Sequence, residues 1–274
     1  MERVAVVTGA ARGIGAATVV GLAAAGWAVV AVDRASDDPR LPYAMGTESE
    51  LHDVVASAQA VSTRATGDRG TDAQRIVAKV ADTTDPDAMA SAVDMAEERF
   101  GGLDAMVAVA GVIAGGVPLW EMPGDQLGAV LGVDLGGPIT AARAGIPAML
   151  RRPVPRHGRF LAVASAAASR GLPKLAAYSA AKAGVAGLVR GLAVELAGTG
   201  ITANAVSPGS TATATLDESA RLYGLDDPQS FADQQAIGRL LTPEEVAVML
   251  VWLAGSDSAP LTGAVIPVDG GLSL

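Results

Sequence analysis

The sequence predicts a single α/β domain of the Rossmann-like, doubly wound type, with a seven-stranded parallel sheet and helices on both faces. Short apolar runs alternate with helical patterns along all 274 residues, and no linker interrupts them. The runs are apolar throughout, which is typical of strands buried on both faces. A glycine-rich turn separates the first run from the first helical pattern. We therefore expect one domain over residues 1–274.

The strands and helices can be placed in order. Several helices have recognisable starts: Thr47 with Glu50 forms a capping box, Asp85 precedes a first-turn proline, and Thr242 combines both signals. The helix after Thr47 carries an apolar stripe that we expect to pack on the sheet. The strands are expected at residues 3–8, 28–33, 75–81, 103–109, 158–165, 201–207 and 264–268.

Composition excludes several classes of protein. The chain has no cysteine, which excludes disulfides and thiolate chemistry. A net charge of −9 and 3% aromatic residues argue against a nucleic-acid binder. No apolar stretch is long enough for a signal peptide or membrane span, so a cytoplasmic protein is expected. His52 and His157 lie far apart, so no metal site is expected, and the four arginines of residues 151–159 are interpreted as a solvated loop.

The first turn, from Thr8 to Gly15, has the character of a phosphate-binding loop. Gly9, Gly13 and Gly15 let the backbone turn tightly and approach a pyrophosphate, and the following helix presents free N–H groups. Asp33 ends the second strand eighteen residues after Gly15, where a carboxylate suits a ribose hydroxyl of NAD. The pattern therefore predicts a dinucleotide site.

Two arginines complicate the choice of dinucleotide. Arg12 and Arg34 could hold the 2′-phosphate of NADP, whereas the carboxylate of Asp33 would repel that phosphate. We favour NAD over NADP.

Tyr178 and Lys182 are the strongest candidates for chemistry. Their spacing of four places both side chains on one helix face. A free tyrosine has a pKa near ~10, and a neighbouring ammonium lowers it toward the range of a general base. Taken alone, the pair could equally be two exposed residues of an Ala-rich helix.

Together these motifs resemble the short-chain dehydrogenase/reductase family. The resemblance runs from Val4 to the C-terminus and includes residues 8–15, residues 204–209 and Ser165, which lies thirteen residues before Tyr178. It implies that Tyr178 is the acid/base, that Ser165 hydrogen-bonds the substrate oxygen, and that Lys182 lowers the tyrosine pKa and holds the nicotinamide ribose. The ligand of such a sheet lies beyond the carboxyl ends of the strands, so the site residues should converge there. The expected cofactor-binding residues are Gly9, Arg12, Gly13, Ile14, Gly15, Asp33, Asp82, Thr83, Ala110, Gly111, Tyr178, Lys182, Pro208, Gly209, Thr211 and Thr213.

A narrower similarity concerns an insertion at about residues 34–62. This segment and residues 111–121, 170–173 and 203–211 are similar to the mycofactocin-coupled subfamily. The resemblance implies an NAD held so tightly that it does not exchange, with mycofactocin as the electron acceptor.

Two positions depart from the wider family. The usual Asn-Asn-Ala-Gly is replaced by residues 108–111, Ala-Val-Ala-Gly, so a side chain that braces the strands is missing. Asp134 stands where the family has a catalytic asparagine, and an ionised Asp134 would oppose the effect of Lys182 on Tyr178. A surface or capping role for Asp134 is the alternative.

Residues from about 210 to 238 are expected to form a lid over the substrate. Its apolar side chains predict a small apolar alcohol or ketone, and Trp120 is either part of that pocket or plain packing. The favoured function is hydride transfer between an alcohol or carbonyl and NAD. The alternatives are an ordinary, freely exchanging carbonyl or ketoacyl reductase and a dinucleotide-binding sensor without catalysis. A homotetramer is expected from the resemblance.

Overall fold

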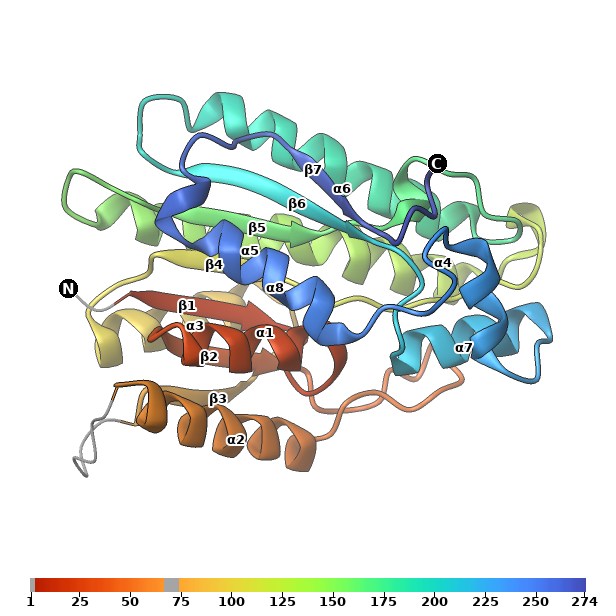
Figure 1. Ribbon diagram of the computed structural model, residues 1–274, viewed down its shortest axis with the longest axis horizontal. Coiled ribbons are helices and arrows are strands. Elements are labelled where there is room, and N and C mark those ends of the chain that lie inside the picture. The colour runs from red at the N-terminus through yellow and green to blue at the C-terminus, as the bar shows by residue number, and fades with distance from the viewer. Residues whose placement is uncertain (1–2, 67–73) are drawn as a thin grey trace.

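The computed structural model describes residues 3–66 and 74–274, and its seven strands form one parallel sheet. The strand order is β3-β2-β1-β4-β5-β6-β7, with every neighbouring pair parallel (Figure 1). The prediction of a doubly wound α/β fold is confirmed. The strands are β1 (Val4–Thr8), β2 (Ala28–Asp33), β3 (Ile76–Val80), β4 (Ala105–Ala108), β5 (Arg159–Val163), β6 (Thr202–Pro208) and β7 (Val265–Val268).

Helices cover the sheet on both faces and form two apolar cores. One face carries α1 (Gly13–Ala24), α2 (Glu48–Thr66) and α8 (Pro243–Ala254), and the other carries α3 (Pro86–Phe100), α5 (Gly137–Arg151) and α6 (Ala176–Glu195) (Figure 1). Alternate strand residues supply the two cores, because successive side chains of a strand point to opposite faces. The strands are therefore apolar at most positions on both faces.

Except for η5, the remaining elements lie around the carboxyl ends of the strands (Figure 1). The end of β4 leads through η1 (Leu119–Glu121) to α4 (Gly124–Leu131) and the π-helical turn η2 (Gly132–Gly136). The end of β5 leads into η3 (Ala166–Ala168), and the end of β6 leads into α7 (Ala214–Tyr223) and η4 (Pro228–Gln234). The short η5 (Ser256–Ser258) follows α8.

The expected helix starts are present. Thr47 and Glu50 exchange hydrogen bonds before α2, and the carboxylate of Asp85 accepts from two N–H groups of α3. Thr242 and Glu245 form the capping box of α8. In each case the side chain satisfies N–H groups that the first helical turn leaves free.

The interpretation of residues 151–159 as a solvated loop is wrong for two of its arginines. Arg152 donates from Nε to Asp104 at 2.8 Å, and its side chain is 13% exposed. Arg159 is buried on β5 and donates to the carbonyl of Gly255, just after α8. Both pairings join positions far apart in the chain, which local charge density does not reveal. Within the described ranges, no helix is both long enough and apolar enough to cross a membrane.

Candidate functional site

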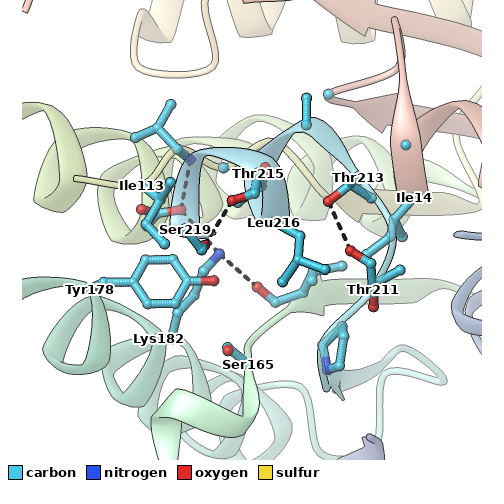
Figure 2. A pocket seen from close by; sticks show the side chains of 18 of the residues that line it. Ile14, Ile113, Ser165, Tyr178, Lys182, Thr211, Thr213, Thr215, Leu216 and Ser219 are labelled. Carbon is cyan, nitrogen blue, oxygen red and sulfur yellow. Dashed lines mark hydrogen bonds and ion pairs between the residues drawn. The ribbon is translucent and has the colours of Figure 1, made fainter. Parts of the chain in front are cut away.

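A cavity of about 700 Å³ lies at the carboxyl ends of the strands, and every predicted catalytic and cofactor-binding residue lines it. The wall is built from the turn after β1, the ends of β2 to β6, and α6 and α7. Figure 2 shows Tyr178, Lys182 and Ser165 on one side of this space and Thr211, Thr213 and Ile14 on another. The expected convergence at one edge of the sheet therefore occurs.

The glycine turn is shaped for close approach by a ligand. Gly9 and Gly13 have φ values of +69° and +58°, in the left-handed region that favours glycine. A Cβ on Gly15 would lie 1.9 Å from the carbonyl oxygen of Gly9, so a larger residue cannot occupy that position. Arg12 precedes α1 without capping it by its side chain, which leaves first-turn N–H groups available to an anion.

The missing brace after β4 is replaced from β1. The hydroxyl of Thr8 accepts from the backbone N–H groups of Val109 and Ala110 at 3.1 and 3.2 Å. A Cβ on Gly9 would lie 2.8 Å from Ala110, so the two loops are in close contact. The turn after β4 is thus held in place without the family's asparagine.

Asp33 ends β2 with its carboxylate at the cavity wall. Its two oxygens accept from the backbone N–H groups of Ala11 and Ala35, each at 3.0 Å. These bonds fix the orientation of the carboxylate. Each oxygen keeps a lone pair, so the carboxylate can still accept from ribose hydroxyls.

The two arginines that could favour NADP are engaged within the protein. Arg34 donates to Asp38 at 2.8 Å and lies 3.6 Å from Asp82. Arg12 donates to the carbonyl of Ala44 at 2.8 Å. Both guanidinium groups therefore already have an acceptor within the protein.

Tyr178 and Lys182 lie one turn apart on α6, and Ser165 ends the loop after β5. The ammonium nitrogen of Lys182 is 5.7 Å from the centroid of the Tyr178 ring and donates to the carbonyl of Val163 at 3.1 Å. The Ser165 hydroxyl accepts from the N–H of Ala167 and faces the same space as the phenol (Figure 2). The Ser165 hydroxyl, the Tyr178 phenol and the Lys182 ammonium therefore lie together at one end of the cavity.

Asp134 joins this group from η2. Its Oδ1 lies 3.1 Å from the ammonium of Lys182 and accepts from the N–H of Val112 at 3.2 Å. The carboxylate is fully buried, and its Oδ2 has no hydrogen-bond partner among the described residues. A surface or capping role for this residue is excluded, because the side chain faces the lysine inside the protein.

Burial and charge set the pKa values of these groups. Burial raises the pKa of Tyr178 above its usual value, Lys182 and the Ser165 hydroxyl oppose this rise, and Asp134 adds to it. Burial lowers the pKa of Lys182, but Asp134 and Tyr178 outweigh that effect and raise it. Burial also raises the pKa of Asp134, against the attraction of Lys182. In the protein alone, Lys182 does not by itself produce a phenolate at neutral pH.

Tyr43, a partly buried wall residue from the segment after β2, was not predicted from the sequence. Its hydroxyl accepts from the N–H of Ile113 at 2.9 Å, and burial raises its pKa well above the usual range. The same segment contains Asp38, whose carboxylate accepts from Arg34 and from Arg40. The hydrogen bonds from Arg40 hold the pKa of Asp38 well below its usual range. No local pattern marks Tyr43, because its partner lies 70 residues away.

The far end of the cavity is mainly apolar and lies under α7. Tyr223 donates from its hydroxyl to the carbonyl of Pro173 at 2.6 Å, which ties α7 to the loop before α6. Trp120 is 84% exposed and lies outside the cavity wall, so it belongs neither to the pocket nor to the core. The apolar wall at this end consists of Leu172, Leu216, Tyr223, Leu225 and Phe231.

Comparison with known proteins places this site in context. A family model described as enoyl-(acyl carrier protein) reductase matches residues 43–273, and one described as short chain dehydrogenase matches residues 3–66. The chain is 38% identical to the short-chain reductase protein NovJ of Streptomyces niveus, over 98% of this chain and 94% of that protein. It is 39% identical to cis-4-hydroxycyclohexanecarboxylate dehydrogenase of Sinomonas cyclohexanicum, over 98% and 96%. Carveol dehydrogenase of Mycobacterium avium in complex with NAD superposes with a TM-score of 0.89 at 29% identity, over 98% and 97%.

Proposed function

This chain belongs to the short-chain dehydrogenase family and is an oxidoreductase of that type, and we propose that it transfers hydride between an alcohol or its carbonyl and NAD. The convergence of Tyr178, Lys182 and Ser165 on one cavity carries the proposal. A scaffold that only bound a dinucleotide would have no use for this group. Enzymatic turnover is therefore favoured over a sensor role.

The residues present fit NAD. The glycine turn is tightly packed, since a Cβ at Gly15 would clash with the backbone of Gly9, and the uncapped first turn of α1 offers N–H groups to a pyrophosphate. Asp33 suits the adenosine ribose, and the engagement of Arg12 and Arg34 within the protein disfavours an added phosphate. The cofactor is assigned to the predicted set: Gly9, Arg12, Gly13, Ile14, Gly15, Asp33, Asp82, Thr83, Ala110, Gly111, Tyr178, Lys182, Pro208, Gly209, Thr211 and Thr213, all of which line the cavity.

When bound, NAD supplies the acceptor or donor of hydride. Within the protein, the phenolate of Tyr178 takes the proton of the substrate hydroxyl, and the Ser165 hydroxyl donates to the substrate oxygen. Lys182 stabilises the phenolate by its charge. In the reverse direction the Tyr178 phenol returns the proton to the carbonyl oxygen.

The finer part of the proposal is that NAD is retained between turnovers. The segment from Arg34 to Gly46 contributes to the cavity wall and is tied to the rest of the site by Tyr43 and by Arg12. Such ties would have to open before a nucleotide could leave past this segment. Together with the resemblance of this segment to mycofactocin-coupled enzymes, they lead us to propose mycofactocin as the electron acceptor.

The proposed substrate is an apolar, cyclic alcohol or ketone. The apolar wall beneath α7 offers few polar partners, so an apolar ring would be desolvated there at little cost. Two relatives are named for dehydrogenation of hydroxylated six-membered rings, cis-4-hydroxycyclohexanecarboxylate and carveol. We infer a ring of similar size.

Retention is tested by mass spectrometry of the nucleotide released on denaturing extensively dialysed protein. We expect about one NAD(H) per chain, since a tightly held ligand survives dialysis. An empty site that binds and turns over free NAD(P) would establish an ordinary exchanging reductase. An empty site that binds no nucleotide would contradict both enzyme readings.

Matched tyrosine variants locate the ties that hold the nucleotide. Tyr43→Phe removes the acceptor of the Ile113 N–H and should increase the fraction of NAD lost on dialysis. Tyr223→Phe makes the same chemical change under α7 and should retain the nucleotide. Equal loss from the two variants would contradict a specific role of the segment from Arg34 to Gly46.

Catalysis is tested separately with Tyr178→Phe. Loss of the acid/base should lower kcat by about 10²- to 10⁴-fold while the nucleotide stays bound. Turnover within a few-fold of the unmodified protein would overturn the role of Tyr178.

A further inference from the structure

Asp134 is a buried carboxylate that faces the catalytic group from within the protein. It enters from η2, with Oδ1 3.1 Å from the Lys182 ammonium and Oδ2 without a partner in the described part of the chain. Gly111 makes room for this contact, because a Cβ there would lie 2.8 Å from Oδ1 and 3.3 Å from the ammonium. The pair is thus built into the packing between η2, α6 and the turn after β4.

The charged and titratable groups around this pair come from three elements. Tyr178 and Lys182 lie on α6, Asp134 lies on η2, and Tyr43 from the segment after β2 also senses the charge of Asp134. Arg12 and Glu218 act on Tyr43 as well, from farther out in the site. Among the described residues, Lys182 is the only cation recorded against Asp134 or Tyr178.

The formal charges of Tyr178, Lys182 and Asp134 follow from this arrangement. With Tyr178 as a phenol the three side chains are neutral as a group, and with Tyr178 as a phenolate they carry one negative charge. A nicotinamide ring carries one positive charge when oxidised and none when reduced. A buried site that stays neutral therefore pairs the phenolate with the oxidised ring and the phenol with the reduced ring.

An asparagine at position 134 would reverse the pairing of the phenol with the reduced ring. Tyr178 and Lys182 alone are neutral when Tyr178 is a phenolate and positive when it is a phenol. Beside a reduced ring, neutrality would then favour loss of the proton to solvent. The identity of residue 134 therefore decides whether Tyr178 keeps its proton beside the reduced ring.

We propose that Asp134 is a positioning residue that makes the enzyme keep the substrate's hydroxyl proton on Tyr178 after the hydride has moved. In the oxidative step the substrate C–H and O–H bonds break and C=O forms; the hydride reduces the nicotinamide and the proton joins the Tyr178 phenolate. The reduced enzyme then holds a hydride and a proton together. It can deliver both to a second carbonyl compound without drawing a proton from water. This inference rests on the proposed function.

The test is ultraviolet titration of tyrosinate in the protein loaded with NAD⁺ and, separately, with NADH. The Tyr178→Phe variant identifies the Tyr178 signal against the two other tyrosines of the chain. With Asp134 present, Tyr178 should remain a phenol through neutral pH in the NADH form and ionise at lower pH in the NAD⁺ form. Asp134→Asn should lower the midpoint of the NADH form by about one pH unit or more, as removal of a charge at this distance does.

Glu97→Gln is the matched control, since it removes a carboxylate from the Arg151 ion pair on the far side of α3. It should leave both midpoints unchanged. An unchanged NADH midpoint in Asp134→Asn, with nucleotide bound, would overturn the inference and leave the proposed function standing. Failure of the protein to take up either nucleotide would overturn both.

Discussion

At the scale of single residues, the catalytic group differs from a simple tyrosine–lysine pair in its net charge. Burial and Asp134 raise the pKa of Tyr178, and Lys182 opposes them. A further positive charge near Asp134 would favour the phenolate. On the inference above, the reaction and the ionisation of Tyr178 are coupled through Asp134.

The pH dependence of alcohol oxidation should report this coupling. A base whose pKa is raised is charged only at higher pH, so activity should rise with pH through the Tyr178 midpoint. Asp134→Asn removes a charge that raises this pKa, and the pH–rate midpoint should therefore move down. A midpoint that stays in place or moves up, measured over the full pH range, would contradict the role of Asp134.

Gly111 offers a second residue-scale prediction. In Gly111→Ala the new Cβ would press on Asp134 and Lys182 and displace the pair. We expect kcat to fall on the order of 10²-fold, the effect of a misplacement near 1 Å. Gly132→Ala in η2 is the control, since its Cβ would meet nothing within 4 Å and should change kcat little. Equal effects of the two alanines would rule out a specific packing role for Gly111.

At the scale of elements, the segment after β2 depends on ion pairs of Asp38. Arg40 and Arg34 depress the pKa of Asp38, so the stabilisation is fully present above its ordinary value of 3.8 and is lost progressively as the pH falls from there through the depressed pKa of the folded chain. Asp38→Asn should mimic this loss at neutral pH and increase the rate of NAD release. Release is measured by dialysis against a nucleotide-free buffer at pH 7 and at pH 3.5. Acidification should speed NAD release less in the Asp38→Asn variant than in the unmodified chain, because the variant lacks the carboxylate that becomes protonated.

The capping box of α8 gives a prediction for a helix. Thr242→Ala removes the side chain that accepts from the Glu245 N–H, which should cost about 1 kcal/mol of stability. Calorimetry should show Tm lower by roughly 2–4 °C. Thr242→Ser keeps the hydroxyl and should restore most of this loss. A full loss in the serine variant would assign the effect to the methyl group instead.

At the scale of the whole molecule, apolar side chains on the outside favour self-association. Val248 and Trp252 lie one turn apart on α8 and are 69% and 43% exposed, and Val194 on α6 is 77% exposed. We propose a homotetramer, whose mass by light scattering would be four times 27.3 kDa. Val248→Glu should reduce that mass, whereas Val154→Glu, in the loop before β5, should not. A monomeric unmodified chain would contradict the proposal.

The sequence predicted most of the fold because its signals are local. The apolar runs, the three helix caps and the turn from Thr8 to Gly15 each lie within a few residues, and the strands occur where expected. Tyr178, Lys182 and Ser165 could be placed in one cleft because strand ends of a parallel sheet meet there. Tyr43 and the Thr8 brace could not be predicted, because their hydrogen bonds span 70 and about 100 residues. The interpretation of Arg152 and Arg159 as solvated was wrong for the same reason, because their partners are also far away in the chain.

The cavity wall draws on residues from Thr8 near one end of the chain to Leu272 near the other. During synthesis, the glycine turn therefore leaves the ribosome long before the residues that complete its binding site. A ligand stabilises only a state that can bind it, so bound NAD would favour states in which both of these segments are folded. Bound nucleotide therefore stabilises the contact between segments that are far apart in the chain.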